Sequence, residues 1–316
     1  MRALVFHGPG DVRLEDVPKP EPREPGDVLV EIGVALTDGT DAKAFARGHP
    51  VLLGPPPSPF GHEFCGLDVA TGQRVVAANS APCGTCRPCA RGQETLCESL
   101  LPLLNGAYAE YLLVPARIAQ TNLLRVPPTM PSEVAALVEP LACCLHGVER
   151  AEIAPDTRVA VLGLGPIGLM LCACIADAGG KPIGVGGRPE RQALAPAFGA
   201  ELDDGRGADV AIEAAGTEDA WLAALELVRP GGTVLAFGGL PAATRVPVDA
   251  FRIHYEEVTL RGAFHHAPRH VRAALAFLAS GAYPFERLVT HRVGLDGVAS
   301  LLADPPRDYL KAAVIL

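Results

Sequence analysis

The stretch RVAVLGLGPIGLMLCACI, residues 158–175, carries the strongest structural signal in the chain. A short apolar run typical of a buried strand leads into the pattern Gly-x-Gly-x-x-Gly, and an apolar helical run follows. Glycines at this spacing allow a tight turn, close approach of the backbone to a pyrophosphate, and close packing of helix on strand. The free N–H groups at the helix start then attract the phosphates, and the alternative is a glycine-rich turn that binds nothing. The predicted dinucleotide site consists of Gly163, Leu164, Gly165, Pro166, Ile167 and Gly168.

Strands and helices alternate across residues 158–263 around this stretch. Such alternation predicts a parallel sheet covered by helices on both faces, a doubly wound Rossmann domain, which we assign to residues 148–282. Residues 1–130 consist instead of short apolar or alternating runs broken by Gly and Pro, which predicts a β-rich domain. The last segment reads as strand, helix and strand that return to this domain. The predicted fold is therefore α/β, with residues 1–147 and 283–316 in one domain and the Rossmann domain inserted between them.

The end of the second strand of the Rossmann unit indicates which dinucleotide is bound. NAD-binding proteins place an acid there, about 20 residues after the glycine turn, to accept hydrogen bonds from the adenosine ribose. This chain reads VGGRPER at residues 185–191. No carboxylate repels a 2′-phosphate, and Arg188, beside Gly187 and with help from Arg191, would attract one. The sequence therefore favours NADP over NAD, and the alternative is that both arginines are solvated residues at a helix start.

The composition excludes several classes of function. The formal net charge of −9 argues against a nucleic-acid surface, and no cluster of Lys or Arg suggests binding to an anionic membrane. The longest apolar runs fall short of the roughly eighteen residues that a membrane span needs. The N-terminal MRALVFHGPG lacks the apolar core of a signal peptide. We therefore expect a cytoplasmic protein.

Four of the nine cysteines lie close together, in the segment CGTCRPCARGQETLC. In a reducing compartment such clustering indicates metal binding rather than disulfides. The spacing C-x2-C-x2-C-x7-C suits four thiolates around one tetrahedral zinc, and a site closed by four protein ligands is structural. The alternatives are an iron–sulfur cubane and a redox pair formed by one CxxC. The predicted zinc ligands are Cys83, Cys86, Cys89 and Cys97.

Six features along the chain, in this order, resemble the zinc-dependent medium-chain dehydrogenase/reductase superfamily. They are TDGTD at 37–41, GHE at 61–63, the cysteine segment at 83–97, EP at 139–140, GLGPIG at 163–168 and THRVGLDGV at 290–298. Glu139 in VEPLA is similar to the glutamate of the polyol and sugar dehydrogenase branch. The resemblance implies a GroES-like catalytic domain built from both ends of the chain, an inserted Rossmann domain, and a homodimer or homotetramer.

The resemblance also implies an activity and a second zinc. The activity is reversible hydride transfer between NAD(P) and a secondary alcohol, polyol or sugar, with a catalytic zinc that lowers the pKa of the alcohol. By the family pattern His62 and Glu139 are ligands of that zinc, and Glu63 is an acid beside it. Thr40 matches the hydroxyl residue that begins a proton relay, and Lys43 stands where the family often has a histidine to end it.

Asp38 departs from this pattern, because the family has a cysteine at this place in TDGTD. A carboxylate is a legitimate zinc ligand and keeps the total ligand charge that a thiolate would give. It loses the preference of a soft thiolate for zinc, so we expect weaker metal retention and room for Mn²⁺ or Co²⁺. In the alternatives, Asp38 is only a turn residue in a decayed site of a non-catalytic NADP-binding protein, or the chain is a metal-free NADPH quinone or enone reductase.

Overall fold

A computed structural model describes residues 1–49 and 51–316 of the chain. By internal contacts the chain divides into two compact units. The first consists of Met1–Ala142 and His266–Leu316, and the second of Cys143–His265. These limits differ from the domain boundaries expected at 147/148 and 282/283, and the expected boundaries stay a prediction.

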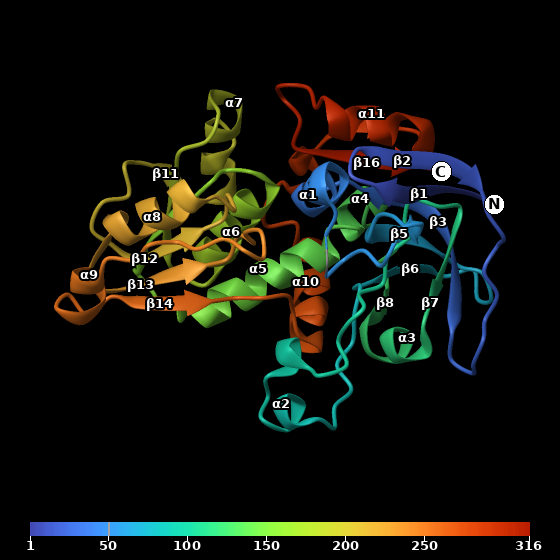
Figure 1. Ribbon diagram of the computed structural model, residues 1–316, viewed down its shortest axis with the longest axis horizontal. Helices are drawn as coiled ribbons and strands as arrows, with labels where there is room; N and C mark the ends of the chain where they lie inside the picture. The colour runs from blue at the N-terminus through green and yellow to red at the C-terminus, as the bar shows by residue number, and fades with distance from the viewer. Residues whose placement is uncertain (50) are drawn as a thin grey trace. The chain divides into compact units, whose positions relative to one another are not determined.

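The second unit is built on one six-stranded parallel sheet (Figure 1). In order across the sheet the strands are β11 (Glu201–Leu202), β10 (Lys181–Val185), β9 (Arg158–Leu162), β12 (Ala208–Glu213), β13 (Val228–Ala236) and β14 (Thr259–Gly262). The chain begins at β9, builds outward to β11, then returns beside β9 and builds outward the other way. This is the strand order of a doubly wound Rossmann sheet and confirms the predicted fold.

Helices connect the parallel strands and cover the sheet. α6 (Pro166–Asp177) packs on β9 and β10, and α8 (Glu218–Leu227) packs on β12 and β13. Because crossovers between parallel strands are right-handed and these two run in opposite directions along the sheet, the two helices cover opposite faces. The shorter helices of this unit are α7 (Pro189–Gln192), η2 (Ala195–Phe198) and α9 (Ala250–His254). The chain enters this unit within α5 (Val138–Ala151).

The glycine turn between β9 and α6 leaves no room for side chains at two of its positions. Gly163 has a φ of +101°, and a Cβ at Gly168 would lie 1.9 Å from the carbonyl oxygen of Gly163. Gly165 is the N-cap of α6, and Pro166 is its first residue. Backbone groups rather than side chains therefore line the start of the helix, as an anion-binding turn requires.

The first unit holds a seven-stranded, mostly antiparallel sheet and a three-stranded sheet. The larger contains β15 (Val289–Val293), β16 (Lys311–Ile315), β3 (Val28–Leu36), β5 (Glu63–Asp68), β6 (Arg74–Ala77) and β8 (Leu123–Arg125) in this order, with β7 (Tyr111–Val114) paired to β3. The smaller contains β2 (Asp11–Asp16), β1 (Arg2–Gly8) and β4 (Ser58–Pro59). Both ends of the chain thus build one β-rich unit, as expected.

Strand pairing brings three distant segments together at one end of the larger sheet. β16 is antiparallel to β3, with Ala313 opposite Leu36, and Leu36 also lies opposite Glu63 of β5. The start of β16 at Lys311, the end of β3 and the start of β5 therefore meet. The residues that follow β3 are Thr37 and Asp38, so two of the motifs singled out in the sequence are neighbours here.

The segment TDGTD leads into a helix. Asp38 is the N-cap of α1 (Gly39–Arg47), and Asp41 lies in its first turn. The other helices of this unit are α2 (Arg87–Ala90), η1 (Glu94–Leu96), α3 (Ala116–Asn122), α4 (Ser132–Ala135), α10 (Pro268–Ser280), η3 (Phe285–Leu288), η4 (Leu295–Gly297) and α11 (Val298–Ala303). In the described part of the chain, each helix is too short or too polar to cross a membrane.

The glycine of GHE is explained by an aromatic ring in the core of the first unit. Gly61 has a φ of +88°, and a Cβ there would lie 2.6 Å from the ring of Tyr108. Tyr108 is fully buried and packs edge-on against Phe60 at 5.6 Å between ring centroids. The missing side chain at residue 61 thus admits the tyrosine ring, whose hydroxyl points to the helix start at Asp41.

We predict that Gly168→Ala destabilises the second unit by about 2 kcal/mol or more, because the new methyl group overlaps a backbone carbonyl that cannot move freely. Gly262→Ala is the matched control, since Gly262 lies on β14 with open space around it and no positive φ. Thermal and urea unfolding measure both. Equal stability of the two variants would contradict the described packing of the glycine turn.

Candidate metal centre and cofactor loop

A buried ion pair lies where β16, β3 and β5 meet. Lys311 Nζ donates to both carboxylate oxygens of Glu63, at 2.8 and 2.7 Å, and to the carbonyl oxygen of Thr37 at 3.0 Å. Both side chains are almost completely inaccessible to solvent. Burial alone would lower the pKa of Lys311, but the charges of Glu63 and Asp38 raise it above its ordinary value. Burial raises the pKa of Glu63 well above its ordinary value, and the charge of Lys311 opposes that rise. The two side chains therefore hold each other in a fixed position.

His62, the residue before Glu63, is surrounded by acids. Its Nε2 lies 3.8 Å from Asp38 Oδ2, and its Nδ1 lies 3.2 Å from Asp41 Oδ1. Burial disfavours a charged imidazole, but the carboxylates of Asp41 and Asp38 outweigh it and raise the pKa of His62 well above its ordinary value. The carboxylates therefore create a potential that attracts positive charge to this ring.

Asp38 and Asp41 form a capping box at the start of α1. Asp38 Oδ1 accepts a hydrogen bond from the backbone N–H of Asp41 at 2.7 Å, and Asp41 Oδ2 accepts from the N–H of Asp38 at 3.1 Å. The hydroxyl of Tyr108 donates to the same Oδ2 at 2.5 Å. Asp41 is completely buried. Its carboxylate contacts the helix start, the hydroxyl of Tyr108 and the ring of His62.

Glu139 lies in the first turn of α5 and completes the acidic surroundings of His62. Potential ligand atoms of His62, Glu63 and Glu139 lie within 4.8 Å of one another, and those of Asp38, Asp41 and His62 form a second such group. The structure therefore brings both Asp38 and Glu139 to His62, in two overlapping groups. Glu139 Oε1 also lies 3.8 Å from Nε2 of the buried His266.

The donor set of this centre fits a divalent cation. Asp38, Asp41, Glu63 and Glu139 are four buried carboxyl groups, with the ammonium group of Lys311 as a buried counter-charge. So many buried carboxylates are costly unless a positive charge joins them. Carboxylate oxygen and imidazole nitrogen are donors that Zn²⁺, Mn²⁺ and Co²⁺ accept.

The two residues expected to move protons lie on α1. Thr40 and Lys43 are both half-buried and are three residues apart on this helix. Side chains at this spacing are neighbours on a helix surface. The structure therefore places the expected start and end of the relay on one face of α1.

The four clustered cysteines come together in a loop of the first unit that carries α2 and η1 (Figure 1). Their sulfur atoms lie within 4.8 Å of one another. The backbone N–H of Cys83 donates to Cys97 Sγ at 3.2 Å, and that of Cys86 donates to Cys83 Sγ at 3.4 Å. Hydrogen bonds from Thr85 and Cys86 lower the pKa of Cys83 to about 5. Thiolates stabilised in this way fit a tetrahedral metal ion.

The arginines expected to select the dinucleotide lie beside the glycine turn of the second unit. Arg188 is the N-cap of α7, and Arg191 lies within this helix. The Nη1 atom of Arg191 is 3.9 Å from the position that a Cβ of Gly165 would occupy. Gln192 Nε2 donates to the carbonyl oxygens of Gly186 and Gly187, at 3.3 Å each. The loop is thus held by its own hydrogen bonds, with cationic groups near the phosphate-binding turn.

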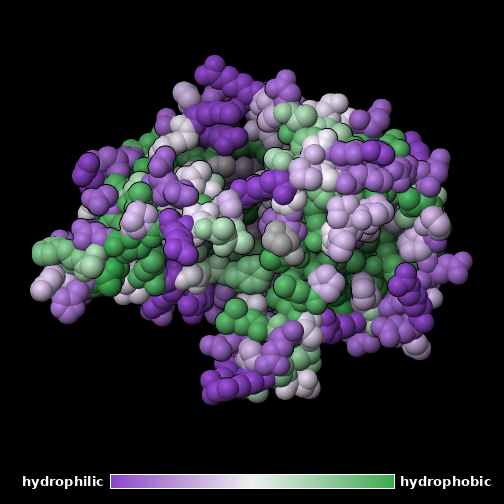
Figure 2. All heavy atoms as spheres, viewed as in Figure 1, coloured by the Kyte–Doolittle hydropathy of each residue, from purple (hydrophilic) through white to green (hydrophobic). Residues whose placement is uncertain are grey.

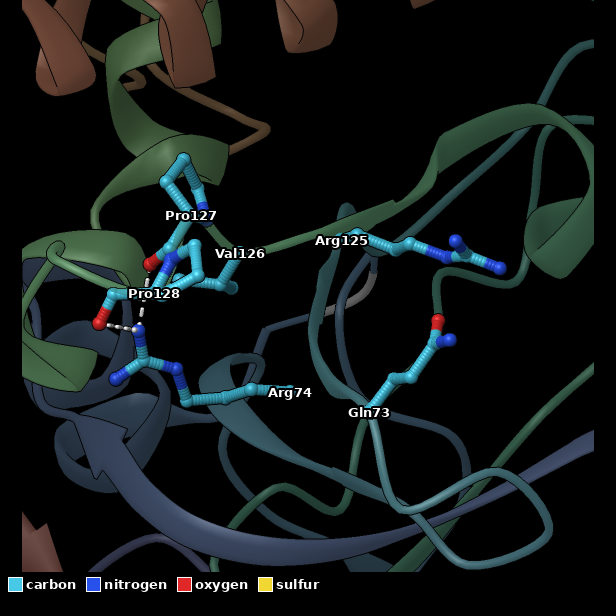
Figure 3. A pocket seen from close by; sticks show the side chains of 6 residues that line it. All are labelled: Gln73, Arg74, Arg125, Val126, Pro127 and Pro128. Atoms are coloured by element: carbon cyan, nitrogen blue, oxygen red, sulfur yellow. Dashed lines mark hydrogen bonds between the residues drawn. The ribbon is translucent and has the colours of Figure 1, made fainter.

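A groove of the first unit lies apart from these ligands. It has a volume of about 570 Å³, and Arg74 in its wall donates to the carbonyl oxygens of Pro127 and Pro128 at 2.6 and 3.2 Å (Figure 3). Arg125 and Gln73 also line it, and their end groups point away from Arg74 in Figure 3. The groove contains none of the candidate ligands, so we assign it no part in the site.

Sequence reasoning missed Asp41 and Lys311. Asp41 could have been found, because an acid three residues after an N-cap Asp is a capping-box pattern. Lys311 could not, since 248 residues separate it from Glu63 and no local pattern marks it.

Comparison with known proteins finds a family model for a segment of each half of the chain. The family model "Alcohol dehydrogenase GroES-like domain" matches residues 24–128, and the model "Zinc-binding dehydrogenase" matches residues 166–280. An erythritol/L-threitol dehydrogenase of Mycolicibacterium smegmatis is 33% identical over 95% of this chain and 94% of its own length. A sorbitol dehydrogenase of Bacillus subtilis is 29% identical over 94% of this chain and 91% of its own length.

Solved structures agree. A protein from Sinorhizobium meliloti 1021 described as a zinc-binding dehydrogenase, with NADP bound, has a TM-score of 0.88 and 30% identity, covering 100% of this chain and 99% of that one. Alcohol dehydrogenase from Thermus sp. ATN1 has a TM-score of 0.87 and 30% identity, covering 100% of both chains. The chain belongs to the zinc-binding dehydrogenases of the medium-chain alcohol dehydrogenase superfamily. Within it the chain falls in the polyol branch, and it is an NAD(P)-dependent oxidoreductase of alcohols or polyols.

We predict that Lys311→Met destabilises the protein by about 3–5 kcal/mol, because it leaves the Glu63 carboxylate buried without its cation. Urea unfolding of the purified protein measures the loss. The double variant Lys311→Met with Glu63→Gln should recover most of it, since neither charge is then unpaired. A single variant as stable as the parent protein would show that the pair contributes nothing.

Proposed function

We propose that the chain oxidises a small polyol or secondary alcohol with NADP⁺, and reduces the corresponding ketone in reverse. The observation that carries this is the convergence of Asp38, Glu63 and Glu139 on one buried imidazole, His62. The relatives named above act on erythritol, L-threitol and sorbitol, which makes a short polyol the preferred substrate class.

Asp38, His62 and Glu139 would hold the catalytic metal. They supply two carboxylates and a neutral imidazole, a donor set whose charge balances that of a dication. A bound metal would act as a Lewis acid that lowers the pKa of the alcohol. Because a carboxylate replaces a thiolate at residue 38, we propose that the centre retains zinc less firmly than its relatives and works with Mn²⁺ or Co²⁺.

Residues of this chain handle the substrate proton and the charge of the centre. Thr40, in the first turn of α1, would accept the proton of the alcohol, and Lys43 on the same helix would pass it outward. Both carboxylate oxygens of Glu63 accept hydrogen bonds from Lys311, which fixes the position of the side chain. From there Glu63 would offset part of the positive charge of the bound metal. The four-cysteine loop would hold a second, structural zinc through Cys83, Cys86, Cys89 and Cys97.

The preference for NADP rests on the loop after β10. Two glycines occupy the place of the ribose-binding acid, and Arg188 and Arg191 follow them. The neighbouring structure from Sinorhizobium meliloti has NADP bound, which supports the same choice.

We also propose a homodimer or homotetramer located in the cytoplasm. β14 is an outer strand of its sheet, and an outer strand leaves one row of backbone groups available for pairing. Large apolar side chains are exposed beside it: Phe251 at 56%, Tyr255 at 72% and Leu260 at 39%. Apolar atoms reach the surface over α9 in Figure 2. A second copy of the chain would cover them.

The zinc content of protein purified without chelators tests the proposed metal sites. We expect two metal ions per chain in the parent protein and one in His62→Ala, because the cysteine loop keeps its ion. His254→Ala is the matched control, since His254 is exposed on α9. The proposal fails if the parent protein holds one ion after addition of Zn²⁺, Mn²⁺ or Co²⁺ and does not oxidise polyols.

A cofactor comparison tests the proposed role of the arginines. We predict that Arg188→Ala raises the KM for NADP⁺ about tenfold, the effect of losing one hydrogen bond to a charged group. The KM for NAD⁺ should stay within about twofold, because NAD⁺ lacks the 2′-phosphate. Arg206→Ala, an exposed arginine in a turn of the same unit, serves as the control. An equal rise for both cofactors would remove Arg188 from 2′-phosphate recognition.

A further inference from the structure

The two oxygens of the Asp38 carboxylate face different partners. Oδ1 accepts the hydrogen bond of the Asp41 N–H at 2.7 Å and so caps α1. Oδ2 lies 3.8 Å from Nε2 of His62, on the side of the proposed metal. The side chain is nine-tenths buried, so solvent competes little for either oxygen. One side chain can therefore serve a helix start with one atom and a metal ion with the other.

Asp41 extends the same link to the histidine. Its Oδ2 accepts from the Asp38 N–H and the Tyr108 hydroxyl, which leaves Oδ1 directed at His62 Nδ1, 3.2 Å away. Among the described residues, neither Asp41 Oδ1 nor His62 Nδ1 has another hydrogen-bond partner. A carboxylate at Nδ1 orients a histidine so that Nε2 is the atom available to a metal. Asp41 is thus a positioning residue for His62.

We propose that Asp38 is at once the N-cap of α1 and a metal ligand, so that metal binding and formation of the first turn of α1 stabilise each other. The inference rests on the proposed function for the metal, and it adds the coupling to the helix. A metal ion that holds Oδ2 also fixes the carboxylate in the orientation that caps the helix. By linkage, a ligand that prefers the capped form stabilises that form.

The coupling reaches the proposed proton relay. Thr40 lies in the turn that Asp38 caps, and Lys43 lies one turn further along α1. A frayed first turn would move Thr40 away from the substrate. Loss of the metal would therefore also disorder Thr40, the proposed start of the proton relay. Without its metal, the enzyme would lose the proton relay as well.

Two substitutions at residue 38 separate the two roles. Asp38→Asn keeps an oxygen that caps a helix well but is a poor metal ligand. Asp38→Cys keeps an anionic metal ligand but loses the oxygen cap. We expect the Asn variant to hold one metal ion per chain, with exchange at the Asp41 amide as fast as in the chelated parent protein and unchanged by chelation. We expect the Cys variant to hold two metal ions per chain. Hydrogen exchange at its Asp41 amide should be about fivefold faster than in the metal-bound parent protein.

Residue-resolved amide exchange and metal content, measured on the full chain, test the inference. In the parent protein, chelation should speed exchange at the Asp41 amide, whereas in Asp38→Cys it should change little. The matched control is Asp249, which caps α9 in the second unit by accepting from the Phe251 N–H at 2.8 Å. Asp249→Cys should speed exchange at Phe251 equally with and without metal, and should leave two ions per chain.

The outcomes distinguish this inference from the function on which it rests. Full metal content in Asp38→Asn would show that Asp38 is not a ligand. Unchanged exchange at Asp41 in Asp38→Cys would show that it is not the cap. If chelation leaves exchange at Asp41 unchanged in a parent protein that holds two ions, the coupling is wrong and the proposed function stands. A parent protein with one ion contradicts the proposed function, whatever the exchange shows.

Discussion

The pairing of β16 with β3 is the constraint on which the first unit depends. It draws the last strand of the chain into the larger sheet and brings Lys311 to the ends of β3 and β5. The ammonium group then meets Glu63, a carboxylate that would otherwise be buried without a positive partner. Because a lone buried charge is costly, the strand pairing and the ion pair support each other. The acids around His62 lie next to this strand pairing and ion pair.

The fold of the second unit follows from local patterns in the sequence. Its strands and helices alternate, and α6 and α8 pack on the strands that they connect, so the pattern of residues 158–263 predicts the arrangement of this unit. The glycine turn could be recognised from its local spacing alone, although Ala215 and Arg191, from later in the chain, lie against Gly163 and Gly165. The β-rich character of the first unit was also predictable. Its strand order was not, since β16 pairs with a strand nearly the whole chain away.

The candidate site was predicted in part, and its gaps have physical reasons. Asp38, His62 and Glu139 were found because each lies in a motif, and the structure brings them to a common imidazole. The helix start at TDGTD was not predicted, because Thr, Asp and Gly are frequent in turns and also at helix starts. The acid at residue 41 distinguishes the two, since it completes a capping box. Lys311 has no such local signature.

The carboxylate at residue 38 also bears on chemical durability. A thiolate in a catalytic centre is open to oxidation to sulfenic and sulfinic acids, whereas carboxylates and imidazole resist mild oxidants. The donors around His62 are carboxylates, so peroxide would find no sulfur among them. Oxidative damage would begin instead in the cysteine loop, where Cys83 is partly exposed and its pKa is lowered to about 5. Under oxidative stress the sulfur atoms of the cysteine loop would thus be oxidised before the donor atoms around His62.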